Sequence, residues 1–283
     1  MRNNQAHSWM VMLIVVMCSF VFLLSAAAED IGIFEVPRDL LEIHDDEFAY
    51  DPSIHVLRVH SGVSIISIAV NYQLPNLQRY DVDEASMYFT SADGVLYSKD
   101  MKQLIAYPPG KQDKSFIVPD QVKYIGEMAF HGNTCLEQIT LGQNTTHIMD
   151  CAFRNCSNLA MVHMNDALLC IGREAFANTA VSAVSFPNSL QYIGTAAFQS
   201  TRLSTVELPP SLLVIGAEAF VDCIHLQSID IPASVIYLVT PICGWNHMAP
   251  DKRIDVYVCA GSYASVMMKT NDSVIVYSKP ALN

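Results

Sequence analysis

Basic residues are scarce in this sequence. Lys and Arg together number 16 against 28 Asp and Glu, which gives a formal net charge of -12 at pH 7. An acidic chain without a basic tract is repelled by nucleic acid and by anionic lipid, since both carry negative charge. We therefore expect no nucleic-acid partner.

Motifs of catalysis and phosphate binding are missing as well. The sequence has no Gly-x-Ser-x-Gly elbow and no His-Glu-x-x-His, and Gly110-Lys111 lacks the other residues of a phosphate-binding loop. His163 could serve a Cys nucleophile in principle, but no partner motif accompanies it. We expect no enzymatic activity and no cofactor.

Metal-binding patterns are also weak. Acidic residues gather near the start of the chain, at Asp45, Asp46, Glu47, Asp51, Asp81, Asp83 and Glu84. They lack the spacing of an EF-hand loop, so a solvated surface is the main interpretation and a calcium site the alternative. Cys151 and Cys156 lack the short paired spacing of a structural zinc site. We expect no metal.

A long apolar run occurs only at the N-terminus. Arg2 precedes an apolar stretch from Trp9 to Leu24, and Ala26-Ala27-Ala28 supplies the small residues at which a signal peptidase cuts. The stretch predicts a signal peptide over residues 1–28, with an uncleaved membrane anchor as the alternative. Cleavage removes one basic residue and changes the net charge from -12 to -13. We expect a secreted or cell-surface protein.

What the sequence does contain is a repeat. Five copies of Ile-Gly-x-x-Ala-Phe, or a near relative, end at Phe130, Phe153, Phe176, Phe198 and Phe220. Successive Phe residues are 23, 23, 22 and 22 positions apart. Such a period is typical of stacked coils, in which each repeat shares its core with its neighbours. The sequence predicts a solenoid whose Phe side chains form one column.

Each repeat also carries a strand pattern after its Phe. An apolar triplet begins five or six residues later, and its last two members lie two positions apart, so both face one side of an extended segment. The triplets are Leu136, Ile139, Leu141; Leu159, Val162, Met164; Val181, Val184, Phe186; Leu203, Val206, Leu208; and Leu226, Ile229, Ile231. Each repeat therefore contains a strand with one buried face.

The Ile-Gly-x-x-Ala-Phe motif and the Leu-x-x-Ile-x-Leu strand resemble the BspA-type leucine-rich repeats, a family of secreted or surface proteins of bacteria and some protists. The resemblance covers roughly Ile43 to Tyr277. It implies a leucine-rich-repeat solenoid, predominantly β, with about 22–23 residues per coil. It also implies adhesion to host or matrix proteins, and it leaves the partner open because one scaffold hosts unrelated binding surfaces.

Two degenerate coils extend the array toward the N-terminus. The first is headed by Ile43 and Phe48 and the second by Ile65 and Val70. Residues 83–115 then break the period, and Asp93-Gly94 between apolar segments predicts a β-hairpin there. Proteins of the resembled family often carry such a hairpin, so we interpret the insertion as a decoration of the solenoid.

The C-terminal segment departs from the repeat. Leu238 and Cys243 take the Ile and Phe positions of a last coil, after which an alternating strand at Ile254–Val258, a short helix capped by Ser262 and a strand at Val274–Tyr277 follow. The open end of a solenoid needs a cover. We therefore divide the mature chain into a solenoid over residues 29–243 and a cap over 244–283.

Seven cysteines remain outside the signal peptide, an odd number. Cys156 and Cys223 each lie three residues after a repeat Phe, where a small buried residue suits the corner of a coil. A disulfide between Cys135 and Cys156 of the next coil is the alternative, since stacked strands lie ~4.8 Å apart.

The outward positions of the strands are the candidate binding residues. They are Gln138, Thr140, Met161, His163, Ala183, Ser185, Thr205, Glu207, Ser228 and Asp230, continued in the degenerate coils by Val56, Arg58, Arg79 and Asp81. In stacked coils they form two columns of mixed polarity, a surface suited to a large partner. The other interpretation is that small polar residues merely solvate the sheet.

The sequence as a whole predicts a non-catalytic binding or adhesion protein that recognises extracellular, host or matrix proteins through the strand face. The alternative is a structural or accessory component of a cell-envelope assembly, docked through the hairpin or the cap. A hydrolase would need a nucleophile and a base that converge in a pocket.

Overall fold

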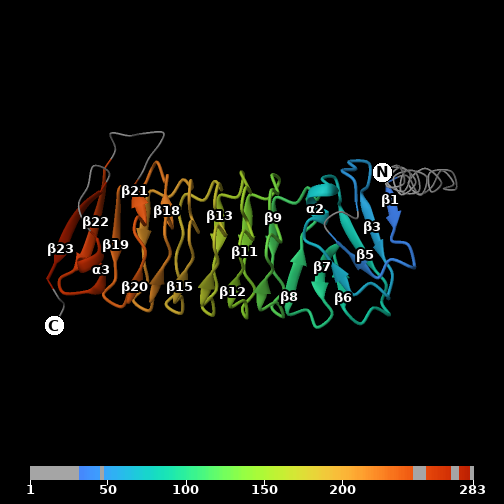
Figure 1. The fold of residues 1–283 in the computed structure, drawn as a ribbon, viewed down its shortest axis with the longest axis horizontal. Coiled ribbons are helices and arrows are strands. Elements are labelled where there is room, and N and C mark those ends of the chain that lie inside the picture. The colour runs from blue at the N-terminus through green and yellow to red at the C-terminus, as the bar shows by residue number, and fades with distance from the viewer. Residues whose placement is uncertain (1–31, 45–47, 245–252, 269–273, 281–283) are drawn as a thin grey trace, which may run out of the picture.

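The computed structural model describes residues 32–44, 48–244, 253–268 and 274–280. The predicted signal peptide and the acidic residues Asp45, Asp46 and Glu47 lie outside these described residues. The described chain is an elongated, predominantly β solenoid of about 10 turns, and its coils stack in chain order along one axis (Figure 1). The predicted fold class is confirmed.

One wall of the solenoid is a nine-stranded sheet built largely from the Ile positions of the repeats. Its parallel strands are β8 (Gln103–Ala106), β10 (Tyr124–Ile125), β12 (His147–Ile148), β14 (Cys170–Ile171), β15 (Tyr192–Ile193), β17 (Val214–Ile215) and β20 (Tyr237–Leu238). Ile125 pairs with Ile148, and Ile148 with Ile171, so the register advances by one repeat at each step. The second residue of each two-residue strand is therefore buried.

A second wall carries the strands predicted from the apolar triplets, divided into three sheets. The N-terminal sheet contains β1 (Ile33–Glu35), β3 (Val56–Val59) and β5 (Arg79–Val82). The central sheet contains β9 (Ser115–Ile117), β11 (Gln138–Thr140) and β13 (Met161–His163). The C-terminal sheet contains β16 (Thr205–Glu207), β19 (Ser228–Ile231), β22 (Ile254–Cys259) and β23 (Val274–Lys279). Paired strands within each of these sheets are parallel.

The five repeat Phe side chains form a single column inside the solenoid, as predicted. Neighbouring rings are stacked with centroids 4.8 to 5.6 Å apart and interplanar angles of 4 to 21°. The column begins one coil earlier than predicted, because Tyr107 stacks on Phe130 at 4.8 Å. It ends at Cys243, which pairs with Phe220 between β18 (Phe220–Val221) and β21 (Cys243–Gly244).

The corner that precedes each Phe explains the Gly of the motif. An added Cβ at Gly194 would lie 2.6 Å from the backbone N of Arg173 and the backbone C of Gly172, so only glycine lets the coils approach. The residue two before each Phe has a left-handed φ of 52 to 60°, and these residues are Met128, Cys151, Glu174, Ala196 and Glu218. Each donates its N–H to a carbonyl of the following coil. The corner is thus a second hydrogen-bonded ladder.

The degenerate N-terminal coils form a separate hydrophobic core. Ile43 of β2 (Glu42–Ile43) pairs with Ile66 of β4 (Ile65–Ile66), and Ile65 is 44% exposed. The prediction that Ile65 heads the second coil was therefore wrong by one position. Val70 is buried as expected, although it begins the one-turn helix α2 (Val70–Gln73).

The predicted hairpin is present, but it is not a decoration. β6 (Phe89–Ala92) and β7 (Val95–Ser98) pair antiparallel around Asp93-Gly94. Along β7, Val95 and Tyr97 pack into the central core whereas Leu96 packs into the N-terminal core. Because neighbouring residues of a strand face opposite sides, β7 is a partition between the two cores.

The end of the insertion, predicted at Ser115, also needs correction. Strand β8 already pairs in parallel with β10, and Tyr107 already stands in the aromatic column. The chain therefore re-enters the coil path at Gln103. A 23-residue step back from Phe130 reaches Tyr107 and was the signal that the sequence offered.

The C-terminal segment covers the last coil of the array. Strand β22 continues the C-terminal sheet beside β19, and β23 pairs with β22. Between them, Ser262 caps the helix α3 (Tyr263–Met267) by accepting a hydrogen bond from the N–H of Ser265. Ile254, Val256 and Val258 alternate into the core, as the sequence predicted.

The seven cysteines outside the predicted signal peptide are all free thiols in the described chain. Cys156 and Cys223 are buried, and their Sγ atoms donate to the carbonyls of Phe130 and Phe198, at 3.0 and 3.1 Å. Both fill the corner position that the sequence assigned to a small residue. Cys135 is half-buried and lies 3.5 Å from Gln112 Oε1, so the alternative Cys135–Cys156 disulfide was wrong.

Candidate functional site: the strand face and its cleft

The outward residues of the second wall line up in two columns along the solenoid axis, which we call the strand face. Paired strands place the members of each column side by side. The first column contains Ile33, Val56, Arg79, Ser115, Gln138, Met161, Thr205, Ser228, Asp255 and Ile275. The second contains Glu35, Arg58, Asp81, Ile117, Thr140, His163, Glu207, Asp230, Tyr257 and Tyr277.

The predicted binding residues face solvent to different degrees. Those that are exposed are Met161, His163, Ala183, Ser185, Thr205, Glu207 and Asp230, whereas Gln138, Thr140 and Ser228 are half-buried. The residues between them on the same strands, such as Ile139 and Ile229, are buried. The predicted orientation is confirmed, and the binding role of each side chain stays a prediction.

One coil interrupts the regular strand pattern of this face. Ala183 makes an isolated bridge with Met161, and Ser185 lies outside any strand. Phe186 of the same coil turns inward and meets Phe198 edge-on at 5.5 Å. The break separates the central sheet from the C-terminal sheet.

The chemistry of the strand face changes from one sheet to the next. In the N-terminal sheet, Arg58 bonds Glu35 at 2.8 Å and lies 3.7 Å from Asp81, which also pairs with Arg79. The central sheet instead presents uncharged side chains and His163. In the C-terminal sheet, Tyr257 and Tyr277 stack at 5.2 Å, and Lys279 Nζ lies 4.9 Å from the centre of the Tyr257 ring. A partner therefore meets three different chemical zones.

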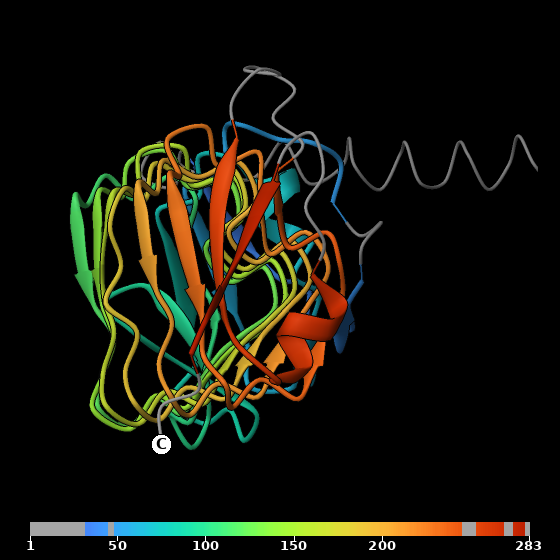
Figure 2. The ribbon, with the colours of Figure 1, turned by 90° about the vertical axis from the view of Figure 1, so that its left-hand side faces the viewer.

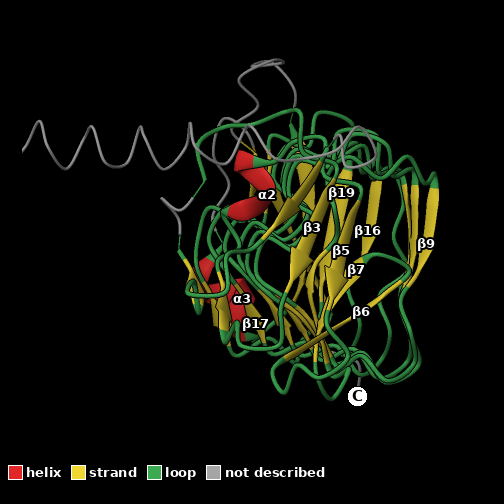
Figure 3. Cartoon of the chain, turned by 90° about the vertical axis from the view of Figure 1, so that its right-hand side faces the viewer, coloured by secondary structure: helices red, strands yellow, loops and turns green. Residues whose placement is uncertain are grey.

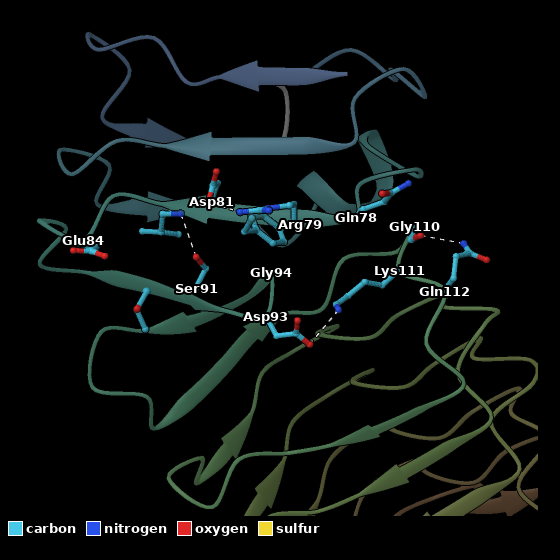
Figure 4. A pocket seen from close by; sticks show the side chains of 13 residues that line it. Gln78, Arg79, Asp81, Glu84, Ser91, Asp93, Gly94, Gly110, Lys111 and Gln112 are labelled. Atoms are coloured by element: carbon cyan, nitrogen blue, oxygen red, sulfur yellow. Dashed lines mark hydrogen bonds and ion pairs between the residues drawn. The ribbon is translucent and has the colours of Figure 1, made fainter. Parts of the chain in front are cut away.

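A cleft of about 760 Å³ opens where the hairpin separates the N-terminal and central sheets. Strand β5 forms one wall, the hairpin contributes Ser91 of β6 and the turn residues Asp93 and Gly94, and the segment 110–112 that leads toward β9 forms the other side (Figure 4). Its volume lies within the range of ligand pockets, but its lining is mainly polar.

Lys111 organises the far side of this cleft. Its Nζ lies 3.4 Å from Asp93, 3.1 Å from Asp113 and 5.9 Å from the centre of the Tyr107 ring. The Tyr107 hydroxyl donates to Asp113 at 2.7 Å, and this bond, together with Lys111, holds the pKa of Asp113 below its usual value. Burial, followed by the bond to Asp113, raises the pKa of Tyr107. Asp113 therefore stays ionised and fixes both neighbours.

Sequence reasoning found one side of this cleft and missed the other. Arg79 and Asp81 stood among the outward positions, and Asp93-Gly94 marked the turn. Lys111 and Asp113 carried no signal, because their partners lie in the hairpin and in the aromatic column, and only the folded chain brings these together.

Metal and membrane signals are weak in the part of the chain that the structure describes. No three His, Cys, Asp or Glu side chains gather there in a way that could hold a metal ion. None of the helices described there is long and apolar enough to cross a bilayer.

Comparison with known proteins identifies the type of repeat. Residues 111–227 match the "BspA type Leucine rich repeat region" in 6 copies. No curated protein matches the sequence.

Two solved structures share the architecture. The pneumococcal vaccine antigen PcpA superposes with a TM-score of 0.62 at 18% identity over 91% of this chain. A leucine rich cell surface protein from Faecalibacterium prausnitzii superposes with a TM-score of 0.52 at 19% identity over 83% of this chain. The aligned regions span 61% and 62% of those two chains. At these identities the likeness establishes the fold. The described chain is a leucine-rich-repeat solenoid whose central coils match the BspA type of repeat.

Proposed function

We propose that this protein is a non-catalytic, secreted or cell-surface protein that binds other proteins through its strand face. The observation that carries this proposal is the pair of solvent-facing columns that runs along the described solenoid. Their side chains are of mixed polarity and follow one another from coil to coil. The extended surface that results suits a macromolecule better than a small ligand.

The location is supported by the type of repeat and by the likeness to a leucine rich cell surface protein. The partners that we expect are extracellular, host or matrix proteins. The acidic charge disfavours nucleic acid and anionic membranes, apart from an N-terminal anchor if the signal peptide is retained. No cofactor and no metal is part of the proposal.

The test is capture of partners from extracellular matrix and host-cell extracts by the chain without residues 1–28. A triple variant, Thr140→Arg, Ser185→Arg and Ser228→Arg, places a bulky charge on each of three coils and should abolish capture. A matched control, Gln121→Arg, Gln191→Arg and Thr195→Arg, adds the same charge at exposed positions away from the strand face and should leave capture intact. Equal capture by both variants would refute binding through this face.

A second candidate is an accessory component of a cell-envelope assembly, and the cleft beside the hairpin is the observation that favours it. Deletion of the hairpin is not a clean test, because β7 packs into both cores. The single change Lys111→Glu alters the cleft and leaves both columns in place. If it abolishes capture while the triple variant does not, the accessory function is the better account.

A further inference from the structure

Between β5 and β9 the strand face is interrupted at the level where two strands are added to the opposite wall. Strands β7 and β6 extend the nine-stranded sheet beyond β8. Strands are spaced ~4.8 Å apart within a sheet, so adding them to one wall of a solenoid spreads the other wall. Accordingly β5 and β9, which belong to consecutive coils, lie in separate sheets. The edges of β5 and β9 therefore border a gap in the strand face.

The edge of β5 is closed by the hairpin. The N–H of Tyr80 donates to the carbonyl of Gly94 at 2.9 Å, and the N–H of Val82 donates to Ser91 Oγ at 3.2 Å. Gly94 approaches so closely that an added Cβ would lie 2.7 Å from the Cβ of Arg79. This edge has no free N–H to offer at Tyr80 or Val82.

The edge of β9 is open. Toward β11, the carbonyl of Lys114 accepts from Gln138, and the N–H of Val118 donates to Thr140. Because backbone groups alternate sides along a strand, the N–H and C=O groups of Ser115 and Ile117 face the other way. Among the described residues these two N–H groups have no acceptor, and the Ile117 side chain is 73% exposed.

The figures show how the edge is presented. Seen from the N-terminal end of the solenoid, β9 lies at the margin of the molecule and is displaced sideways from β3 and β5 (Figure 3). From the opposite end the same strand again lies at the outer margin (Figure 2). The N-terminal sheet therefore does not cover the strand.

The surroundings of the edge are acidic. Five carboxylates and three cations line the cleft or flank β9, namely Asp81, Glu84, Asp93, Asp113 and Glu137 against Arg79, Lys111 and Lys114. Each of the three cations already pairs with one or more of these carboxylates. The surplus of two negative charges attracts a cationic segment.

We propose that β9 binds an extended, basic segment of a partner protein, which adds to the central sheet as a further strand. Its backbone pairs with Ser115 and Ile117, an apolar side chain covers Ile117, and Lys or Arg side chains reach the cleft. Strand addition draws affinity from main-chain hydrogen bonds and specificity from alternate side chains. This inference rests on the proposed protein-binding function and names the chemistry of one part of the face.

The test uses peptides selected from a displayed library of lysine-enriched decapeptides by binding to the chain without residues 1–28. Ile117→Pro and Ser115→Pro each remove one N–H that points into the gap and leave the bonds to β11 intact, and proline is tolerated on edge strands. Each should weaken the selected peptides roughly tenfold. The matched variants Ile117→Val and Ser115→Val keep the N–H and should lose much less affinity than the two proline variants.

If a proline variant fails to fold, a second measurement uses the unaltered protein. Methylation of alternate backbone nitrogens of the selected peptide removes the N–H groups that would pair with β9. The side chains and the charge of the peptide stay the same, so a loss of binding is expected. Recovery of no basic peptide, or equal binding of the methylated peptide, overturns the inference. The double variant Ser185→Arg, Ser228→Arg distinguishes this inference from the proposed function. If it no longer captures partners from the extracts but still binds the selected peptides, the edge of β9 binds independently of the rest of the strand face.

Discussion

The central coils and the N-terminal coils follow the same path with different interiors. From Tyr107 to Phe220 each aromatic ring stacks on the next, and glycines let the corners touch. In the N-terminal coils, the ring contact of Phe48 within the described chain is edge-on with Phe34 at 5.1 Å, and the buried Val70 stands at the Phe position of the next coil. The face of the N-terminal coils holds a chain of ion pairs instead.

The comparison shows that a solenoid has one continuous core only where successive repeats have the same geometry. Where the consensus fails, β7 separates two cores and the strand face opens into a cleft. In a repeat array, the stability is approximately the sum of the intrinsic stability of each coil and the interaction free energy between neighbouring coils. The two regions should therefore respond separately to mutation.

The largest expected effect is in the aromatic column. Phe176→Ala should lower the free energy of unfolding by about 3–5 kcal/mol, because the fully buried ring stacks on both neighbours. Phe48→Ala, at the rim of the N-terminal core, should fall at the low end of that range. Urea unfolding followed by circular dichroism measures both. Identical losses in one shared transition would show that the two cores are not separate.

The next effect concerns the glycine corners. Gly194→Ala forces a Cβ against the backbone of the preceding coil and should cost about 1–3 kcal/mol. Gly62→Ala in the N-terminal coils meets chiefly the His60 side chain at 3.1 Å, which can move, and should cost less than about 1 kcal/mol. Thermal unfolding of the two variants checks the order. If Gly194→Ala did not lower the thermal stability, the close approach between the backbones of neighbouring coils would be contradicted.

A smaller effect should appear at alkaline pH. Burial raises the pKa of Cys156 and of Cys243 to about 12, from an ordinary value of 9.0. The unfolded chain therefore loses these protons first, and the stability of the central coils falls as pH rises above about 9, by roughly 1 kcal/mol per thiol between pH 9 and 10. The N-terminal coils contain no cysteine among residues 29–82.

Denaturant unfolding at pH 8, 9 and 10 measures this dependence. Cys156→Ala should remove about half of the slope assigned to the two thiols. A slope that is unchanged by this substitution would place the alkaline sensitivity elsewhere, for example at the buried Tyr80 of the N-terminal core, whose pKa is also raised by burial.

The smallest effect is electrostatic. Arg58→Met breaks the linked pairs of the N-terminal face and should cost up to about 1 kcal/mol at low salt, whereas Lys114→Met breaks one exposed pair with Glu137 and should cost less than Arg58→Met. Unfolding in 0.05 and 0.5 M salt measures both changes. Salt should shrink the difference, since it screens exposed charges.

The period, the Phe column, the outward positions and the strand and capped helix near the C-terminus could all be predicted from residue spacing. These features are local or repeat at a fixed step, so residue spacing alone encodes them, as the stacking of Phe153 on Phe176 illustrates. The sequence failed where the step changed. Ile66 rather than Ile65 enters the core, and the coil path resumes at Gln103.

The role of the hairpin and the form of the cleft could not be predicted from the sequence and emerge from the tertiary structure. The two faces of β7 contact residues far apart in the chain, and no local pattern states which core each face joins. The open edge of β9 arises in the same way, since its missing neighbour is defined by strands added on the opposite wall. Interruption of the repeat, rather than the repeat itself, shapes the most distinctive part of this surface.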